Sequence, residues 1–174
     1  MRVPERYSRV DPWLISVDSD AEITFLVAVF GARETPDSRM VGPDGRIRHV
    51  EVDLGGSVIM LFDAQPDWPS TPAHLRVYVD DAQEAFDRAV TAGARAVTRP
   101  THLAFGELVA RVRDPQGHLW WIHQRVDDVP TADLESRFAD PSAQSAMAYV
   151  ERSLTRELSK PREHSVDTSN PAGH

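Results

Sequence analysis

The chain has 174 residues, a formal net charge of −8 and no cysteine. This length suits one domain or two small packed halves, and the lack of cysteine excludes disulfides, thiolate metal sites and a cysteine nucleophile. The negative charge argues against nucleic acid as the main partner, because phosphate binding needs a basic face, and it disfavours a membrane surface. No apolar segment reaches transmembrane length, and the first residues lack the apolar core of a signal peptide. We therefore expect a cytoplasmic protein.

An internal repeat is the most informative feature of the sequence. Residues 14–33 align with a segment 62 residues later, so that Asp18 matches Asp80 and Glu22 matches Glu84. Each copy predicts a strand, an aspartate at a helix N-terminus, about three turns of helix and a glycine that ends the helix.

Two alternating strands follow each predicted helix, and one weaker strand precedes them. The expected strands after the helices are 34–41, 47–54 and 58–63 in the first copy, and 94–100, 107–113 and 119–125 in the second. The chain therefore predicts two βαβββ modules, residues 10–70 and 71–128, in an α+β fold with a cupped mixed sheet around a cleft.

The alternation separates two faces of every strand. One set of alternate residues is apolar and is expected beneath the helices: Val50, Val52, Leu54, Ile59, Leu61, Leu75, Val77, Val79, Leu108, Ala110, Val112, Trp120 and Ile122. The other set mixes aromatic, basic, acidic and thioether side chains, as a small-molecule pocket needs. The alternative is that its charges pair with one another on a wet surface.

The segments DGRIRHVEV, SVIMLFD, VYVDDAQEAFDRAVTAGA and VRDPQGHLWW carry a resemblance to a known family. Together with the paired modules, they resemble the vicinal oxygen chelate superfamily, which includes glyoxalase I, bleomycin-resistance proteins and extradiol dioxygenases, and within it the PhnB-like branch. The resemblance covers about residues 10–126. It implies a U-shaped sheet around a site for a small organic molecule, commonly completed by a homodimer.

Metal-dependent members of this superfamily draw one ligand from the first and the last strand of each module. The resemblance carries these positions to Pro12, Met60, His74 and Trp121. Proline has no side-chain lone pair, an indole only donates and a thioether prefers soft ions, so only His74 suits a hard or borderline divalent ion. The resemblance therefore implies that the family's metal site is absent and that no cofactor is bound.

A divalent metal at another place stays an alternative. His49 and Glu51 share one strand face, and His74 and His123 lie in the other module; with water, such a set would suit zinc or iron. Without a metal, His74, His49 or Glu51 are the candidates for acid-base catalysis. A structural or binding role is the simpler interpretation of each histidine.

Trp121 is the sharper clue, because an indole at a metal position fills that space and offers a flat apolar platform for planar or cationic groups. Met60 and Phe62 extend the apolar lining. The predicted ligand-binding residues are Met60, Phe62, His74, Arg76, Tyr78, Arg111, Trp121 and His123.

Three arginines of the same face, Arg76, Arg111 and Arg113, could hold an anion at the rim of the cleft. Salt bridges to Glu51, Asp53 and Glu107 are the competing interpretation, favoured for at least one of them. His118 is expected to cap a turn in an exposed position.

A helical extension is predicted after the second module, over residues 129–160. A short helix is expected at 131–139, followed by a longer one with Asp140 as its cap and Pro141 at its first position. Residues 161–174 are expected to be a disordered tail. The longer helix carries one apolar stripe, which must pack on the domain or on a partner: Ala143, Met147, Val150, Leu154 and Leu158.

The first functional hypothesis is a small-molecule-binding protein without the family's metal site, which binds or sequesters an aromatic or amphipathic organic ligand. The alternative is a glyoxalase-like lyase or isomerase, or a dioxygenase, that uses a relocated metal or His/Glu acid-base catalysis.

Overall fold

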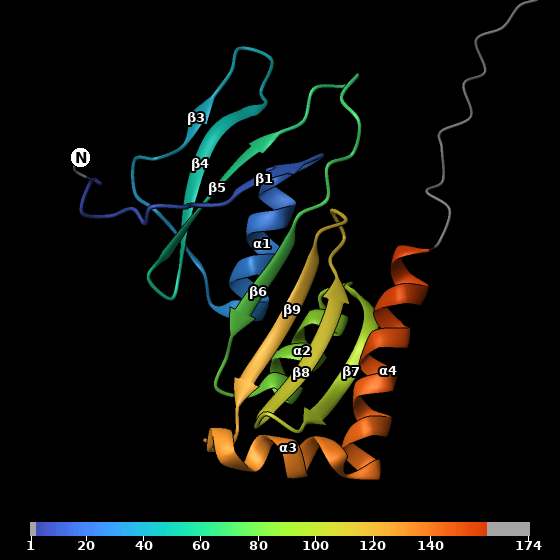
Figure 1. Ribbon diagram of the computed structural model, residues 1–174. Helices are drawn as coiled ribbons and strands as arrows, with labels where there is room; N and C mark the ends of the chain where they lie inside the picture. The colour runs from blue at the N-terminus through green and yellow to red at the C-terminus, as the bar shows by residue number, and fades with distance from the viewer. Residues whose placement is uncertain (1–2, 160–174) are drawn as a thin grey trace, which may run out of the picture.

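The computed structural model describes residues 3–159 and shows two sheets with two helices behind them (Figure 1). Helices α1 (Ser19–Phe30) and α2 (Ala82–Thr91) pack against each other and cover the same side of the two sheets. Helices α3 (Thr131–Ala139) and α4 (Pro141–Leu158) follow the second sheet. The predicted α+β class is confirmed.

The first sheet has the strand order β1-β5-β4-β2, with β3 also paired to β4. The short strands β1 and β5 are parallel, and β4 and β5 form an antiparallel hairpin. Gly55 and Gly56 make its turn, both with positive φ, which favours glycine over any other residue. The strand expected over residues 34–41 is divided into two short strands, β2 and β3. The strands are β1 (Trp13–Ser16), β2 (Arg33–Glu34), β3 (Met40–Val41), β4 (Ile47–Leu54) and β5 (Ser57–Asp63).

The second sheet has the order β6-β9-β8-β7 and keeps the full βαβββ pattern. Strands β6 and β9 are parallel, and the other two pairs are antiparallel. The strands are β6 (His74–Tyr78), β7 (Arg95–Leu103), β8 (Glu107–Arg113) and β9 (Leu119–Arg125).

The apolar residues predicted beneath the helices do form the core. Val50, Leu61, Val112 and Ile122 are fully buried between the sheets and the two helices. Both modules contribute to this one core, so neither sheet buries its helix side alone. This confirms the two-face pattern of the strands.

The repeat is shifted by one residue relative to the sequence alignment. The helix caps are Asp18 and Asp81, whose side chains each accept a hydrogen bond from the third helical N–H. Glu22 therefore takes the core-facing place of Ala85, and the predicted match of Glu22 to Glu84 is wrong. Glu22 is 0% exposed, whereas Glu84 stands in solvent.

A buried polar group of residues links the modules: Ser16 and Glu22 of the first with Asp114, His118 and Trp120 of the second, called here the inter-module cluster. His118 Nδ1 accepts the backbone N–H that precedes β6 at 3.1 Å, so His118 Nε2 carries the proton and donates to Ser16 Oγ at 3.2 Å. Asp114 accepts the His118 backbone N–H at 2.9 Å and Trp120 Nε1–H at 2.8 Å. The prediction that His118 is exposed is wrong, because its ring bridges the modules.

Within the inter-module cluster, Glu22 is the carboxyl group that carries a proton. Its carboxyl lies against Asp114, which already accepts two N–H donors and is thereby stabilised as the anion. Burial raises the pKa of Glu22 to about 9, and the nearby Asp114 charge adds to this effect. Glu22 is therefore protonated at neutral pH.

The two C-terminal helices begin and end close to the predicted places. Asp140 caps α4, accepting the Ser142 backbone N–H at 2.8 Å, and Pro141 is the first helical residue, as expected. Val150 of the predicted stripe packs on Leu103 and Val109, on the sheet face opposite α2. The predicted disordered tail lies outside the described residues. Within residues 3–159, no helix has the length and apolar character to cross a bilayer.

Candidate ligand-binding site

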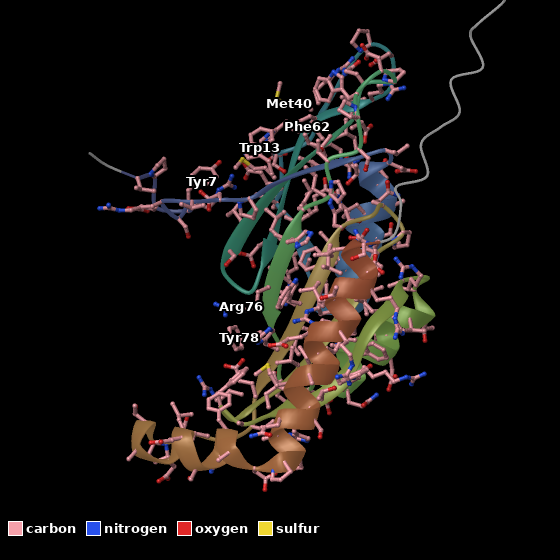
Figure 2. All side chains as sticks on the ribbon, turned by 45° about the vertical axis from the view of Figure 1, so that its right-hand side comes forward. Tyr7, Trp13, Met40, Phe62, Arg76 and Tyr78 are labelled. Atoms are coloured by element: carbon pink, nitrogen blue, oxygen red, sulfur yellow. The ribbon has the colours of Figure 1, made fainter. Side chains whose placement is uncertain are left out.

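The sheet faces turned away from α1 and α2 are called here the open faces. The first open face carries Trp13, which is 47% exposed, and its ring lies 5.4 Å from that of Phe62. Trp68 meets Phe62 at 6.0 Å in the same edge-to-face manner. These three residues form an aromatic cluster that is partly open to solvent. Figure 2 shows Trp13 and Phe62 on the same side of the molecule as Arg76 and Tyr78 of the second sheet.

The open-face residue of β1 is Trp13, not Pro12. Leu14 and Ser16 are buried toward the helix, and Pro12 shares their parity along the strand. Trp13 instead contacts His49, whose ring centroid is 5.6 Å away on the open face. Trp13 is therefore the residue by which β1 contributes an aromatic ring to the first open face.

Glu51 lies at the centre of the first open face and is only 3% exposed. Tyr7 donates its hydroxyl to Glu51 Oε1 at 2.7 Å, His49 Nε2 lies 3.2 Å from the same oxygen, and Arg6 pairs with Oε2. Burial alone would raise the pKa of Glu51, but the hydrogen bonds from Tyr7 and His49 and the Arg6 charge lower it below its ordinary value. The buried group is thus an anion whose cation comes from the N-terminal segment.

The N-terminal segment, residues 3–12, has no helix or strand and crosses the first open face. A pocket of about 520 Å³ lies between this segment and Met60 of β5. A second cleft, of about 700 Å³, opens between the modules on the other side of the segment and is lined by Arg76 and Tyr78. Ser8 and Asp11 line both hollows, so the two lie next to each other along the segment.

The second open face is largely covered by α4. Arg111 is 3% exposed, and its Nη1 donates to the Val150 carbonyl of α4 at 2.9 Å and to Thr98 Oγ1 at 3.1 Å. Its guanidinium carbon lies 3.7 Å from the centroid of the Trp121 ring. Burial lowers the pKa of Arg111 to about 10. The predicted rim position of Arg111 is wrong, and Trp121 presents its ring to this arginine.

Arg113 also turns to α4, where it pairs with Glu157 at 2.5 Å. None of the acidic partners predicted for Arg111 or Arg113 is the observed one, because the helical extension supplies the contacts. Arg76 alone of the three stays exposed, with its guanidinium carbon 5.3 Å from the Tyr78 ring centroid.

A hydrogen-bonded pair, His123 and Glu107, lies on the second open face. His123 Nδ1 lies 2.7 Å from Glu107 Oε2, and Tyr78 donates its hydroxyl to Glu107 Oε1 at 3.1 Å. His123 Nε2 is buried and has no hydrogen-bond partner among residues 3–159. Burial lowers the pKa of His123 and, with smaller contributions from the charges of Arg76 and Arg111, outweighs the opposing effect of Glu107. The imidazole is therefore neutral at pH 7.

The predicted ligand-binding residues thus fall into three sets. Met60 and Phe62 lie on the first open face, and His74, Arg76 and Tyr78 stand exposed on β6, the strand beside the inter-module cleft. The third set lies together on the second open face. Arg111 contacts α4 and the Trp121 ring, and Trp121 in turn stacks with His123.

The predicted relocated metal set does not come together. Glu51 is taken by Arg6 and Tyr7, and His123 by Glu107. Across residues 3–159, no three His, Asp or Glu side chains converge as metal ligands would.

Several residues of these sites escaped the sequence reasoning: Arg6, Tyr7, Trp13, Trp68 and Glu107 as the partner of His123. Trp13 could have been found from the cap at Asp18, which fixes the parity of β1. No local signal indicates the contacts of Arg6 and Tyr7, because their partner is more than forty residues away in the chain.

Comparison with known proteins places these features in a family. The model of the Glyoxalase/Bleomycin resistance protein/Dioxygenase superfamily matches residues 9–122, and the chain belongs to this superfamily. The uncharacterized protein Mb0911c of Mycobacterium bovis is 30% identical over 138 residues, which cover 73% of this chain and 90% of that protein.

Solved structures agree on the fold. TioX from Micromonospora sp. ML1 is 31% identical with a TM-score of 0.55, covering 68% of this chain and 99% of TioX. The fosfomycin resistance protein FosX of Listeria monocytogenes, solved with Mn(II) and sulfate, is 16% identical with a TM-score of 0.53, covering 67% of this chain and 91% of FosX. The likeness to FosX concerns the fold alone.

Proposed function

We propose that this protein binds an aromatic or amphipathic organic molecule on its first open face, without the family's metal site. The observation that carries the proposal is the aromatic cluster: the large rings of Trp13 and Trp68 are left partly in solvent, and Met60, the strand partner of Trp13, lines a pocket of about 520 Å³. Exposed aromatic side chains next to a concave, partly polar surface are typical of ligand sites. Sequestration of such a ligand is the activity that this arrangement supports best.

The replaced ligand positions support the same proposal. Tryptophan at position 13 and at position 121 and methionine at position 60 offer rings and a thioether instead of imidazole or carboxylate. These groups stack and pack against organic ligands, and they are poor ligands for hard divalent ions.

Replacing Trp13 with alanine is expected to weaken binding of planar aromatic compounds about tenfold, since one stacking platform is lost. Because Trp13 is half exposed, the midpoint of thermal unfolding should fall by only a few degrees. A thermal-shift screen of planar aromatic compounds, followed by calorimetric titration of the hits, measures both effects.

The matched control is Val27→Ala, which removes an equally exposed apolar side chain from α1, and which should leave affinity unchanged. Equal losses of affinity in the two variants, or a large loss of stability with unchanged affinity in Trp13→Ala, would contradict the proposed site.

We also propose a cytoplasmic homodimer of the PhnB-like branch. Met40 and Tyr78 support a dimer, because each is more than half exposed, and Figure 2 shows them with Trp13 along one side of the two modules. Apolar groups exposed in this way are common at subunit contacts. Sedimentation of the same wild-type and Trp13→Ala samples measures the mass, and the mass of a single chain in both would contradict the dimer.

A second candidate function is acid-base catalysis by His123. Glu107 fixes the imidazole with its proton on Nδ1, which leaves a lone pair on Nε2 with no partner among the described residues. A carboxylate that orients a neutral histidine in this way is the arrangement of a general base.

The tautomer of His123 tests this candidate directly. Nitrogen-detected NMR is expected to show Nδ1 protonated and Nε2 bare at pH 7, with a titration below the ordinary histidine pKa because burial disfavours the cation. Glu107→Gln should mix the tautomers, whereas His102→Gln, at an exposed position, should not change them. A proton on Nε2 in the wild-type protein would remove the basis for catalysis here.

A further inference from the structure

We propose that the first open face is a site for an organic cation that carries a flat ring, and that the N-terminal segment occupies this site through Arg6 and Tyr7. This inference rests on the proposed function and adds the charge of the ligand. It also assigns Glu51 as the residue that recognises the ligand.

The buried carboxylate is the first step of the argument. Glu51 is nearly inaccessible, and a buried carboxylate is costly unless a cation and hydrogen-bond donors satisfy it. Within the sheet, only His49 contacts it, at 3.2 Å. The cation and the strongest donor, Arg6 and Tyr7, both come from the N-terminal segment. Glu51 therefore needs a cation from outside the sheet.

Arg6 and Tyr7, which occupy the site, have the chemistry of the proposed ligand. The Arg6 guanidinium carbon lies 5.2 Å from the centroid of the Tyr7 ring, so the two side chains together offer a planar cation beside an aromatic ring. They meet a surface with matching groups: the Glu51 carboxylate, and Trp13 next to His49. A ligand with an amidinium, guanidinium or ammonium group on a ring would make the same contacts and add stacking on Trp13.

The N-terminal segment is held loosely on the first open face. Residues 3–12 lack regular secondary structure, and Arg6 itself is half exposed although its carboxylate partner is buried. Because Arg6 keeps contact with solvent while it satisfies Glu51, an external cation can take its place without leaving the carboxylate unpaired. Most of the residues that line the pocket at Met60 belong to this segment, so its displacement would open that pocket to solvent.

The test uses benzamidine, a ring with a planar cation, and benzamide, its neutral counterpart, in calorimetric titrations of the full chain. Arg6→Ala is expected to bind benzamidine about fivefold more tightly than the wild-type chain, because the internal competitor is removed. Benzamide should bind more weakly and equally to both. Glu51→Gln should abolish the preference for benzamidine.

Two further variants keep the test decisive. Arg6→Lys retains the competing charge and should leave benzamidine affinity near that of the wild type, and Arg152→Ala removes an exposed charge from α4 and should have no effect. Equal binding of the two probes in every variant, with both lost in Trp13→Ala, would overturn the cation inference and leave the proposed function standing. No binding of benzamidine to the wild type or to Arg6→Ala up to about 10 mM would overturn the inference as well.

Discussion

Replacing Glu22 with glutamine is expected to stabilise the protein strongly at alkaline pH and to leave its stability at pH 5 nearly unchanged. The pKa of Glu22 is raised by burial and by Asp114 to about 9, above its unfolded value of 4.5. The folded state thus binds the proton more tightly, and its stability is full below pH 4.5 and falls as the pH rises toward 9. Between pH 5 and 9 the wild type should lose about 3 to 5 kcal/mol of unfolding free energy. Glutamine avoids this loss because its amide is neutral at any pH.

Urea unfolding at pH 5, 7 and 9 measures the effect, with Glu84→Gln as the control. Glu84 is the glutamate that the sequence matched to Glu22, and it stands in solvent on α2. The Glu84→Gln curve should run parallel to the wild type. A Glu22→Gln curve that also runs parallel would show that Glu22 is ionised in the folded protein. The assignment of a protonated Glu22 beside Asp114 would then fail.

Replacing Glu157 with glutamine is expected to cost about 3 kcal/mol at pH 7 and almost nothing below about pH 2. Glu157 of α4 is buried, and its two oxygens accept two hydrogen bonds from Arg95 at 2.6 Å and one from Arg113 at 2.5 Å. The bond from Arg95, joined by that from Arg113, outweighs burial and lowers the pKa of Glu157 to about 2. Since the folded value lies below the unfolded value of 4.5, this stability is present above pH 4.5 and is lost as the pH falls toward 2.

The control on the same helix is Glu151→Gln, at an exposed position. It should change the unfolding free energy by less than about 0.5 kcal/mol at any pH. The loss in Glu157→Gln should appear as a fall of on the order of 10 °C in the unfolding midpoint. An equal effect of the two substitutions would mean that the ion pairs of Glu157 do not hold α4 on the second sheet.

The two experiments concern opposite sides of the second sheet. Glu22 acts on the helix side, where the modules meet, and Glu157 acts on the open face, where α4 covers Arg111. A loosened α4 would expose Trp121 and His123, and would restore to that face the accessibility expected of it from the sequence.

The features that depend on near neighbours could be predicted from the amino-acid pattern alone. Alternation set the inner and outer faces of the strands, because successive side chains must point to opposite sides of a sheet. Asp140 and Pro141 fixed the start of α4, because a cap and a proline at the first position act within one turn. The Gly55-Gly56 pair fixed the β4–β5 hairpin by its positive φ angles.

The polar contacts that build the sites, in contrast, depend on how distant segments pack in the folded chain. Ser16 and His118 are 102 residues apart, Arg6 and Glu51 are 45 apart, and Arg111 meets an α4 carbonyl 39 residues later. No periodicity encodes such pairs, because they depend on which face of one element packs on another. A shift of one residue in the repeat was enough to align Glu22 with the buried Ala85 instead of Glu84, and burial there controls its proton.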